Sequence, residues 1–279
     1  MAQLVEHHLA KVRVAGSNPV VRSRGGVVLL ARMLSVVAVV ALAGCADPEA
    51  AEPVVYVAAA SDTRDAFTEL AASLEQSDGV VVEFVFGSSG MLREQVLNGA
   101  PYDVYVSANT TFVDEVVAAG FANPANVSQY ATGVLAMIAR DGAALPDSPA
   151  ALTADDAGGR IAIANPAHAP YGVAAREALE SLGIYDEVAN RLILAENVAD
   201  AVRIVEAGEA DFGLVALALV RQRAHVVVDS DLYEPIRQTA ALTTRGETNA
   251  DARRFFELLL SPEGAEVLRR YGFVVEDAP

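Results

Sequence analysis

Basic residues are scarce in this sequence. It contains one lysine, Lys11, and has a formal net charge of −17 at pH 7 over 279 residues. An extended basic surface for nucleic acid is therefore excluded, and so is the capture of anions by a broad positive field. Any anion site in this chain must work through local hydrogen-bond geometry.

Cysteine is equally scarce, since Cys45 is the only one, and an intrachain disulfide is excluded. Cys45 ends the apolar run "MLSVVAVVALAGC", residues 33–45, which is too short to span a bilayer and is typical of a signal-peptide core. Its last four residues, "LAGC", resemble the bacterial lipobox, in which the cysteine is lipidated. We expect a lipoprotein signal peptide at 33–45, lipidation of Cys45 and a linker at 46–53. The alternative is a buried structural cysteine.

The stretch before the apolar run matches no regular structure. Residues 1–25 fit neither a helical nor a strand pattern. We expect residues 1–32 to be non-structural and to reflect a misassigned start, with the true start at Met33 or slightly upstream. Without residues 1–45, the chain keeps 15 basic and 36 acidic residues, a net charge of −21.

From Val54 onward, apolar runs alternate with helical patterns. This alternation predicts an α/β fold with mainly parallel sheets, and about 230 residues of it favour two lobes. In such sheets ligands bind where strands end and helices begin. The expected strands are 54–60, 80–86, 102–108, 133–139, 160–166, 211–217 and 225–229. The expected helices are 63–74, 91–98, 111–119, 171–182, 198–206, 250–260 and 262–271.

Four strand-to-helix turns could bind a ligand. They are Ser61 after the first strand, "GSSG" at 87–90, "NPAHAPYG" at 165–172, and Asn197 before the helix that begins at Val198. Each places free backbone N–H groups at a helix N-terminus, which can bind an anion without a formal positive charge. Each hydrogen bond to a charged acceptor contributes about 1.5–3 kcal/mol. The alternative for each turn is ordinary capping or turn structure, and for His168 we favour a structural role.

Catalytic patterns are missing from the sequence. A serine nucleophile needs a base and an orienting acid, yet only His168 and His225 follow residue 45. The stretch "FGSSG" departs from the Gly-x-Ser-x-Gly elbow, and HExxH, Cys/His-cluster and Walker motifs do not occur. We therefore predict no enzyme activity, no catalytic residue, no cofactor and no site for a free metal cation.

Taken together and in order, the four turns resemble those of the periplasmic molybdate-binding proteins of ABC transporters, the ModA-like members of the type II periplasmic solute-binding proteins. The similar stretches span about residues 54–273. The resemblance implies two lobes, 54–131 with 237–279 and 132–236, joined by two crossover strands with a hinge near 130–132 and 233–238. The stretches are "VYVAAASDT", "FVFGSSGMLREQVLNGAPYDVYVSA", "NPAHAPYGVAAREALESLG", "AENVADAVRIVEAGEADFGLV" and "RRYGF".

By position, the resemblance assigns the oxyanion contacts to Ser61 and Ser89, through hydroxyl and backbone, and to the backbone amides of Tyr171 and Val198. One position departs from the family pattern. Well-known members carry a tyrosine whose hydroxyl also holds the anion, and this sequence has Ala216 there. Tyr171 stands where those members have alanine. Either its phenol compensates for the missing hydroxyl, or it packs outward and the site has one donor fewer.

The function implied by the resemblance is capture of molybdate or tungstate by a periplasmic, lipid-anchored monomer and delivery to an ABC permease with its ATPase subunit. Molybdate, tungstate and sulfate are dianions near neutral pH. Phosphate keeps a proton and needs an acceptor; Asp62 is the nearest candidate, although its first-turn position favours interaction with the helix dipole. The alternatives are a binding protein for sulfate or another small oxyanion, and an oxyanion sensor without transport.

Overall fold

The computed structural model describes residues 54–153 and 158–276. The expected non-structural segment, the signal peptide with Cys45 and the linker lie outside these residues. Within the described residues, no helix is both long and apolar enough to cross a bilayer.

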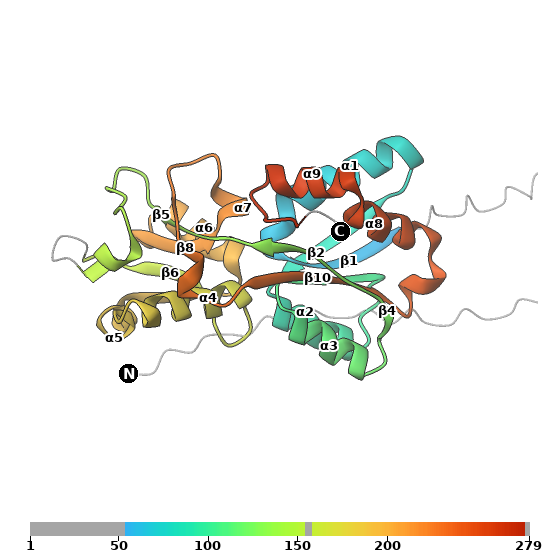
Figure 1. The fold of residues 1–279 in the computed structure, drawn as a ribbon, viewed down its shortest axis with the longest axis horizontal. Helices are drawn as coiled ribbons and strands as arrows, with labels where there is room; N and C mark the ends of the chain where they lie inside the picture. Colours follow the sequence, from blue (N-terminus) through green and yellow to red (C-terminus); the bar gives the residue numbers. More distant parts are fainter. Residues whose placement is uncertain (1–53, 154–157, 277–279) are drawn as a thin grey trace, which may run out of the picture. The chain divides into compact units, whose positions relative to one another are not determined.

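Two five-stranded sheets organise the described residues (Figure 1). Strands β1, β2 and β3 of the first sheet are parallel, and β10 runs antiparallel to β3 and β4. In the second sheet β6, β7 and β8 are parallel, and β5 runs antiparallel to β8 and β9. The first sheet has the order β2 (Val82–Gly87), β1 (Val55–Ala60), β3 (Val104–Ser107), β10 (Ile236–Thr243), β4 (Ala122–Gly133), and the second β7 (Leu192–Ala195), β6 (Ile161–Ala164), β8 (Phe212–Ala216), β5 (Leu135–Ala139), β9 (Val226–Val227).

Helices cover both faces of the first sheet (Figure 1). Side chains alternate along a strand, so Val57 and Ala59 of β1 pack into one apolar cluster with helices α1, α8 and α9, while Ala58 packs into a second with α2 and α3. This two-sided burial explains why β1 reads as a continuous apolar run. The helices are α1 (Arg64–Asp78), α2 (Ser89–Leu97), α3 (Thr110–Ala118), α8 (Ala250–Leu260) and α9 (Pro262–Arg270).

The second sheet carries its own apolar cluster, which includes Met137, Ile163 and Leu214. Its helices α4 and α6 follow strands β6 and β7, so their N-termini lie at the carboxyl ends of parallel strands. The α-helices of this part are α4 (Pro170–Ser181), α5 (Tyr185–Val188), α6 (Val198–Glu206) and α7 (Leu217–Val220). Short 3-10 helices are η2 (Ser61–Thr63), η3 (Pro149–Thr153), η4 (Ala189–Arg191), η5 (Ser230–Leu232) and η6 (Gly246–Thr248).

The two-lobed α/β fold is confirmed, and its sheets are mixed. Four of the eight strand pairs in the described residues are antiparallel, more than the mainly parallel sheets expected from the alternation. Two of these four pairs involve β10, which joins β3 and β4, and the apolar runs did not predict β4 and β10 as strands. The other two pairs involve β5. Strand β4 is polar and contains Pro124, which an edge strand tolerates. Only Val134 separates β4 from β5, so this segment passes directly from one sheet to the other.

Candidate anion-binding site

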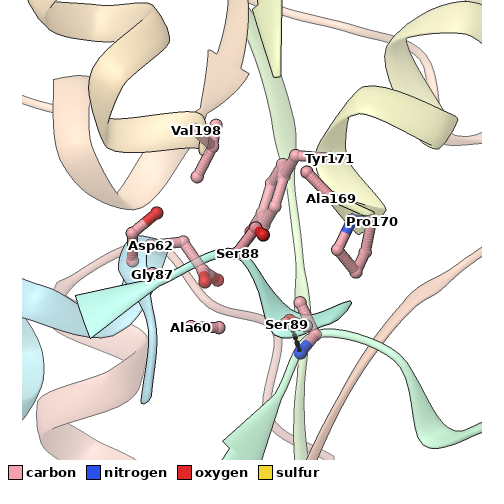
Figure 2. Close-up of a pocket in the computed structure, with 11 residues that line it drawn as sticks. Ala60, Asp62, Gly87, Ser88, Ser89, Ala169, Pro170, Tyr171 and Val198 are labelled. Atoms are coloured by element: carbon pink, nitrogen blue, oxygen red, sulfur yellow. Dashed lines mark hydrogen bonds between the residues drawn. The ribbon is translucent and has the colours of Figure 1, made fainter. Parts of the chain in front are cut away.

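The four turns singled out in the sequence meet at one pocket (Figure 2). All four predicted contact residues line this pocket. Its cavity volume is about 10 Å³, roughly the space of one water molecule. Ser61 lies in η2 after β1, Ser89 opens α2 after β2, and Val198 opens α6 after β7. The lining is Ala60, Ser61, Asp62, Gly87, Ser88, Ser89, Ala108, Ala169, Pro170, Tyr171 and Val198, a set with no Lys, Arg or His.

The two predicted serine hydroxyls each accept a backbone hydrogen bond. The Ala199 N–H donates to Ser61 Oγ over 3.3 Å, and the Ala108 N–H donates to Ser89 Oγ over 3.0 Å. Both serines are buried, with exposed fractions of 2% and 1%. Because each oxygen is engaged as an acceptor, its own O–H remains available to donate to an anion in the pocket.

The two predicted backbone donors lie at helix N-termini. Tyr171 is the second residue of α4, after Pro170 at the first position, and Val198 is the first residue of α6. The N–H groups of a first helical turn have no intrahelical acceptor. The Asn197 side chain caps α6 by accepting from the Asp200 N–H, one turn further on, so it does not occupy the Val198 N–H. Both helix dipoles favour negative charge at these ends.

The "GSSG" turn also contacts the "NPAHAPYG" loop. Ser88 Oγ lies 2.8 Å from His168 Nδ1, and the Gly90 N–H donates to the His168 carbonyl over 2.9 Å. A Cβ on residue 90 would lie 2.8 Å from that carbonyl oxygen, so glycine is needed for this approach. His168 therefore has the structural role favoured from the sequence. It holds the turn after β2 against the loop before α4.

Asp62 is the charged residue of the lining and is 2% exposed. The Gln238 Nε2 donates to Asp62 Oδ2 over 2.6 Å, and the Tyr130 hydroxyl donates to Gln238 Oε1 over 3.2 Å. Asp62 Oδ1 is buried without a hydrogen-bond partner in the described structure, as is the Tyr171 hydroxyl. Burial raises the pKa of Asp62 to about 6, and the nearby Tyr171 hydroxyl and the Gln238 amide offset part of the rise.

Tyr171 points inward. It is 2% exposed, and Figure 2 shows its ring entering the pocket from α4 with the hydroxyl toward Asp62. The hydroxyl also lies against Gly133 at the end of β4, where a Cβ would stand 2.2 Å from it. The alternative that Tyr171 packs outward is therefore wrong. Ala216, where the resemblance leads us to expect a tyrosine, is fully buried at the end of β8 and is not part of the pocket lining.

Comparison with known proteins identifies the family. The profile of the bacterial extracellular solute-binding proteins matches residues 55–274, which is nearly all of the described chain. This chain belongs to that family. Solute-binding proteins are similar to this chain along most of their length, as the following comparisons show.

The molybdate-binding protein ModA of Rhodobacter capsulatus is 35% identical over 236 residues, which cover 84% of this chain and 92% of that protein. The solved periplasmic molybdate-binding protein of Azotobacter vinelandii matches with a TM-score of 0.75 at 31% identity, over 80% of this chain and all of the other. A Bacillus subtilis relative with the provisional name ABC transporter substrate-binding lipoprotein YvgL is 26% identical over 227 residues, which cover 79% of this chain and 86% of that protein.

The four turns predicted from the sequence line one pocket of this solute-binding protein, but part of the pocket's surroundings was not predicted. The expected hinge contains Gln238 and Tyr130, and the structure shows that they also form a buried hydrogen-bond chain to Asp62. The available signal was the stretch "IRQTAALT", in which Gln238 and Thr239 precede the apolar residues at 240–242. Among residues 54–153 and 158–276, no cluster of three or more His, Cys, Asp or Glu side chains could hold a metal ion.

Proposed function

We propose that this protein is an extracytoplasmic solute-binding protein that captures molybdate or tungstate and delivers it to an ABC transporter. One observation carries the proposal most directly. Four strand-to-helix turns from both sheets converge on a single pocket whose lining offers hydroxyl and backbone N–H donors and no basic side chain. The identity of the anion follows the molybdate-binding relatives, whose similarity covers 84% and 80% of this chain.

Neutral donors suit a fully deprotonated tetrahedral dianion. Such an anion presents acceptors on every side, and Ser61 Oγ, Ser89 Oγ and the amides of Tyr171 and Val198 can each donate to it. At about 1.5–3 kcal/mol for each charge-assisted hydrogen bond, several converging donors suffice for tight binding in an acidic protein. The bound species is an oxyanion held through its oxygens, so neither a cation site nor a cofactor is required.

Entry of the anion requires the lobes to separate, because Ser61, Ser89 and Tyr171 in the pocket lining are only 2%, 1% and 2% exposed. The two segments that pass between the sheets, around Val134 and before Ile236, are where backbone rotation would separate the lobes. The Leu135 N–H donates to the Tyr233 hydroxyl over 3.1 Å and so ties the two segments together. We propose a hinge beside these segments, at 130–132 near the end of β4 and at 233–238, between lobes formed by 54–131 with 237–279 and by 132–236.

The protein acts outside the cytoplasm as a monomer and binds without turnover. Its partners are the anion, an ABC permease and the ATPase subunit of that permease. Lipidation of Cys45 anchors it to the membrane, and the lipoprotein name of the Bacillus subtilis relative supports this part of the proposal. Mass spectrometry of the exported protein tests it: an acylated N-terminal cysteine is expected, and an intact "LAGC" segment would contradict the anchor.

A thermal-shift panel tests the ligand class. A ligand that binds only the folded state raises the melting temperature. We expect molybdate and tungstate to raise it more than sulfate, phosphate or chromate at equal concentration. A shift with sulfate alone would reassign the ligand to another small oxyanion, and no shift with molybdate or tungstate would overturn the proposal.

A further inference from the structure

Asp62 combines three features that the anion site as described does not use. It lines the same pocket as Ser61 and Ser89, it is 2% exposed, and its Oδ1 has no hydrogen-bond partner in the described structure. An ionised carboxylate beside a bound dianion would place like charges together in a poorly solvated cavity, where repulsion is strong. A carboxylate that merely capped η2 would not need this burial or this position.

The surroundings of Asp62 leave one atom free to carry a proton. Oδ2 accepts from the Gln238 Nε2 over 2.6 Å, and the other end of that amide accepts from the Tyr130 hydroxyl. The amide therefore has a fixed orientation, with its donor end toward Oδ2. The Tyr171 hydroxyl lies near the carboxylate, but Oδ1 has no hydrogen-bond partner in the described structure and can hold a hydrogen. With that hydrogen, Asp62 becomes an additional neutral donor in a pocket lined by neutral donors.

We infer that Asp62 is a specificity-determining residue of the proposed oxyanion site: it binds one proton on Oδ1 when a dianion enters and donates that hydrogen to the anion. The inference rests on the proposed function in that it requires a dianion in this pocket. The proton comes from solvent, and no bond of the ligand changes. Uptake of the proton keeps the net charge of pocket and ligand at −2 rather than −3.

Other charged groups around Asp62 do not supply this proton or cancel its charge. From α4 and β4 it faces Tyr171 and Tyr130, and burial raises the pKa of both phenols well above 10, so they stay neutral. On α1, Arg64 stacks over Phe86 at 4.5 Å, and Asp65 is exposed. On α6, Asp200 pairs with Arg203 over 2.8 Å, and α7 (Leu217–Val220) carries no charged side chain.

Proton uptake can be counted by titrating molybdate into the protein in buffers of different ionisation enthalpy at pH 7. With the pKa of Asp62 raised to about 6 in the free protein, most of one proton should be taken up for each anion bound at pH 7, as linkage requires. The dissociation constant should rise up to about tenfold per pH unit between pH 7 and 9. Sulfate, also a dianion, should show the same slope at its own affinity.

Two variants separate the charge of Asp62 from its packing. Asp62→Asn keeps an acceptor for the Gln238 amide and should remove both the proton uptake and the pH slope. Asp65→Asn removes an exposed charge three residues away and should leave both unchanged. Measurable binding of molybdate or sulfate by the unmodified protein with no proton uptake would overturn the inference and leave the proposed function standing. No binding of molybdate, tungstate or sulfate at either pH 6 or pH 8 would overturn both.

Discussion

At the scale of single residues, the proposed anion binding depends on serine hydroxyls whose oxygens already accept backbone hydrogen bonds. Ser61 Oγ and Ser89 Oγ each receive one backbone N–H, which orients their free O–H. The sequence could indicate that these serines follow strands, and the family resemblance could select Ser89 over Ser88. It could not show that Ser88 is committed to His168, because that contact joins segments 80 residues apart.

Removing one of these donors should weaken anion binding without unfolding the protein. We expect Ser61→Ala to raise the molybdate dissociation constant by about 10- to 100-fold, the equivalent of about 1.5–3 kcal/mol for a hydrogen bond to a charged group. Isothermal titration calorimetry measures this, with the exposed Ser77→Ala on α1 as the matched control. Equal affinities of the two variants would exclude Ser61 as a donor.

Tyr171 decides whether the pocket has a substitute for the hydroxyl missing at Ala216. Its phenol is buried in the pocket and has no hydrogen-bond partner in the described structure, which makes a donor role available. If the phenol contacts the anion, Tyr171→Phe should weaken molybdate binding by about 10-fold or more. Unchanged affinity in a binding titration would refute the compensation and leave the backbone amide as the only contact of Tyr171.

The ligand-free protein should be destabilised by Asp62 as the pH rises. Its pKa is raised from 3.8 to about 6, so its stabilising contribution is complete below about pH 3.8 and is lost as the pH rises through about 6. A rise in pKa of this size corresponds to about 3 kcal/mol. Urea unfolding should therefore show that, between pH 4 and pH 7, the free energy of unfolding of the ligand-free protein falls by up to that amount relative to that of Asp62→Asn. A constant difference would contradict this account.

At the scale of secondary-structure elements, the sequence predicted the buried strands and the helices that follow them, and it missed the strands that connect the lobes. Buried strands such as β1 and β6 are continuous apolar runs, a strong local signal. Strand β4 is half polar because it lies at a sheet edge, and β10 carries Gln238 into the interior. Their strand character depends on pairing across more than 100 residues, which local patterns do not encode.

The close packing of β4 on α4 gives a test at this scale. A Cβ on residue 133 would lie 2.2 Å from the Tyr171 hydroxyl and 3.0 Å from its Cζ. We expect Gly133→Ala to lower the free energy of unfolding by about 1–3 kcal/mol, as overpacked cores do. Adding Tyr171→Phe should recover part of the loss because it removes the nearest atom. Strict additivity of the two changes in urea unfolding would show that the sites do not interact.

At the scale of the whole molecule, the described chain is a two-lobed α/β protein, as the sequence predicted, and its four candidate turns lie after carboxyl ends of strands. The sequence could not predict that the pocket is closed. Contacts such as Ser88–His168 and Ala199–Ser61 join elements of the two sheets and leave only about 10 Å³ between them. The lobe boundaries at 131/132 and 236/237 and the hinge remain predictions.

Closure itself can be tested through the contacts that hold the turns together. Ser88→Ala removes the hydrogen bond to His168 Nδ1 and leaves the predicted anion donors in place. We expect faster dissociation of molybdate in this variant, with a smaller change in the association rate, because the bond forms as the lobes close. Stopped-flow kinetics would show this, and an unchanged dissociation rate would mean that the pair plays no part in closure.

The most direct test of the central claim is the position of the anion. Anomalous diffraction at the molybdenum edge from crystals grown with molybdate locates the metal atom without reference to any binding assay. The account predicts one strong peak in the pocket, within reach of Ser61 Oγ, Ser89 Oγ and the backbone amides of Tyr171 and Val198. The absence of a peak in the pocket at saturating molybdate, or a molybdenum peak elsewhere on the protein, would contradict this prediction.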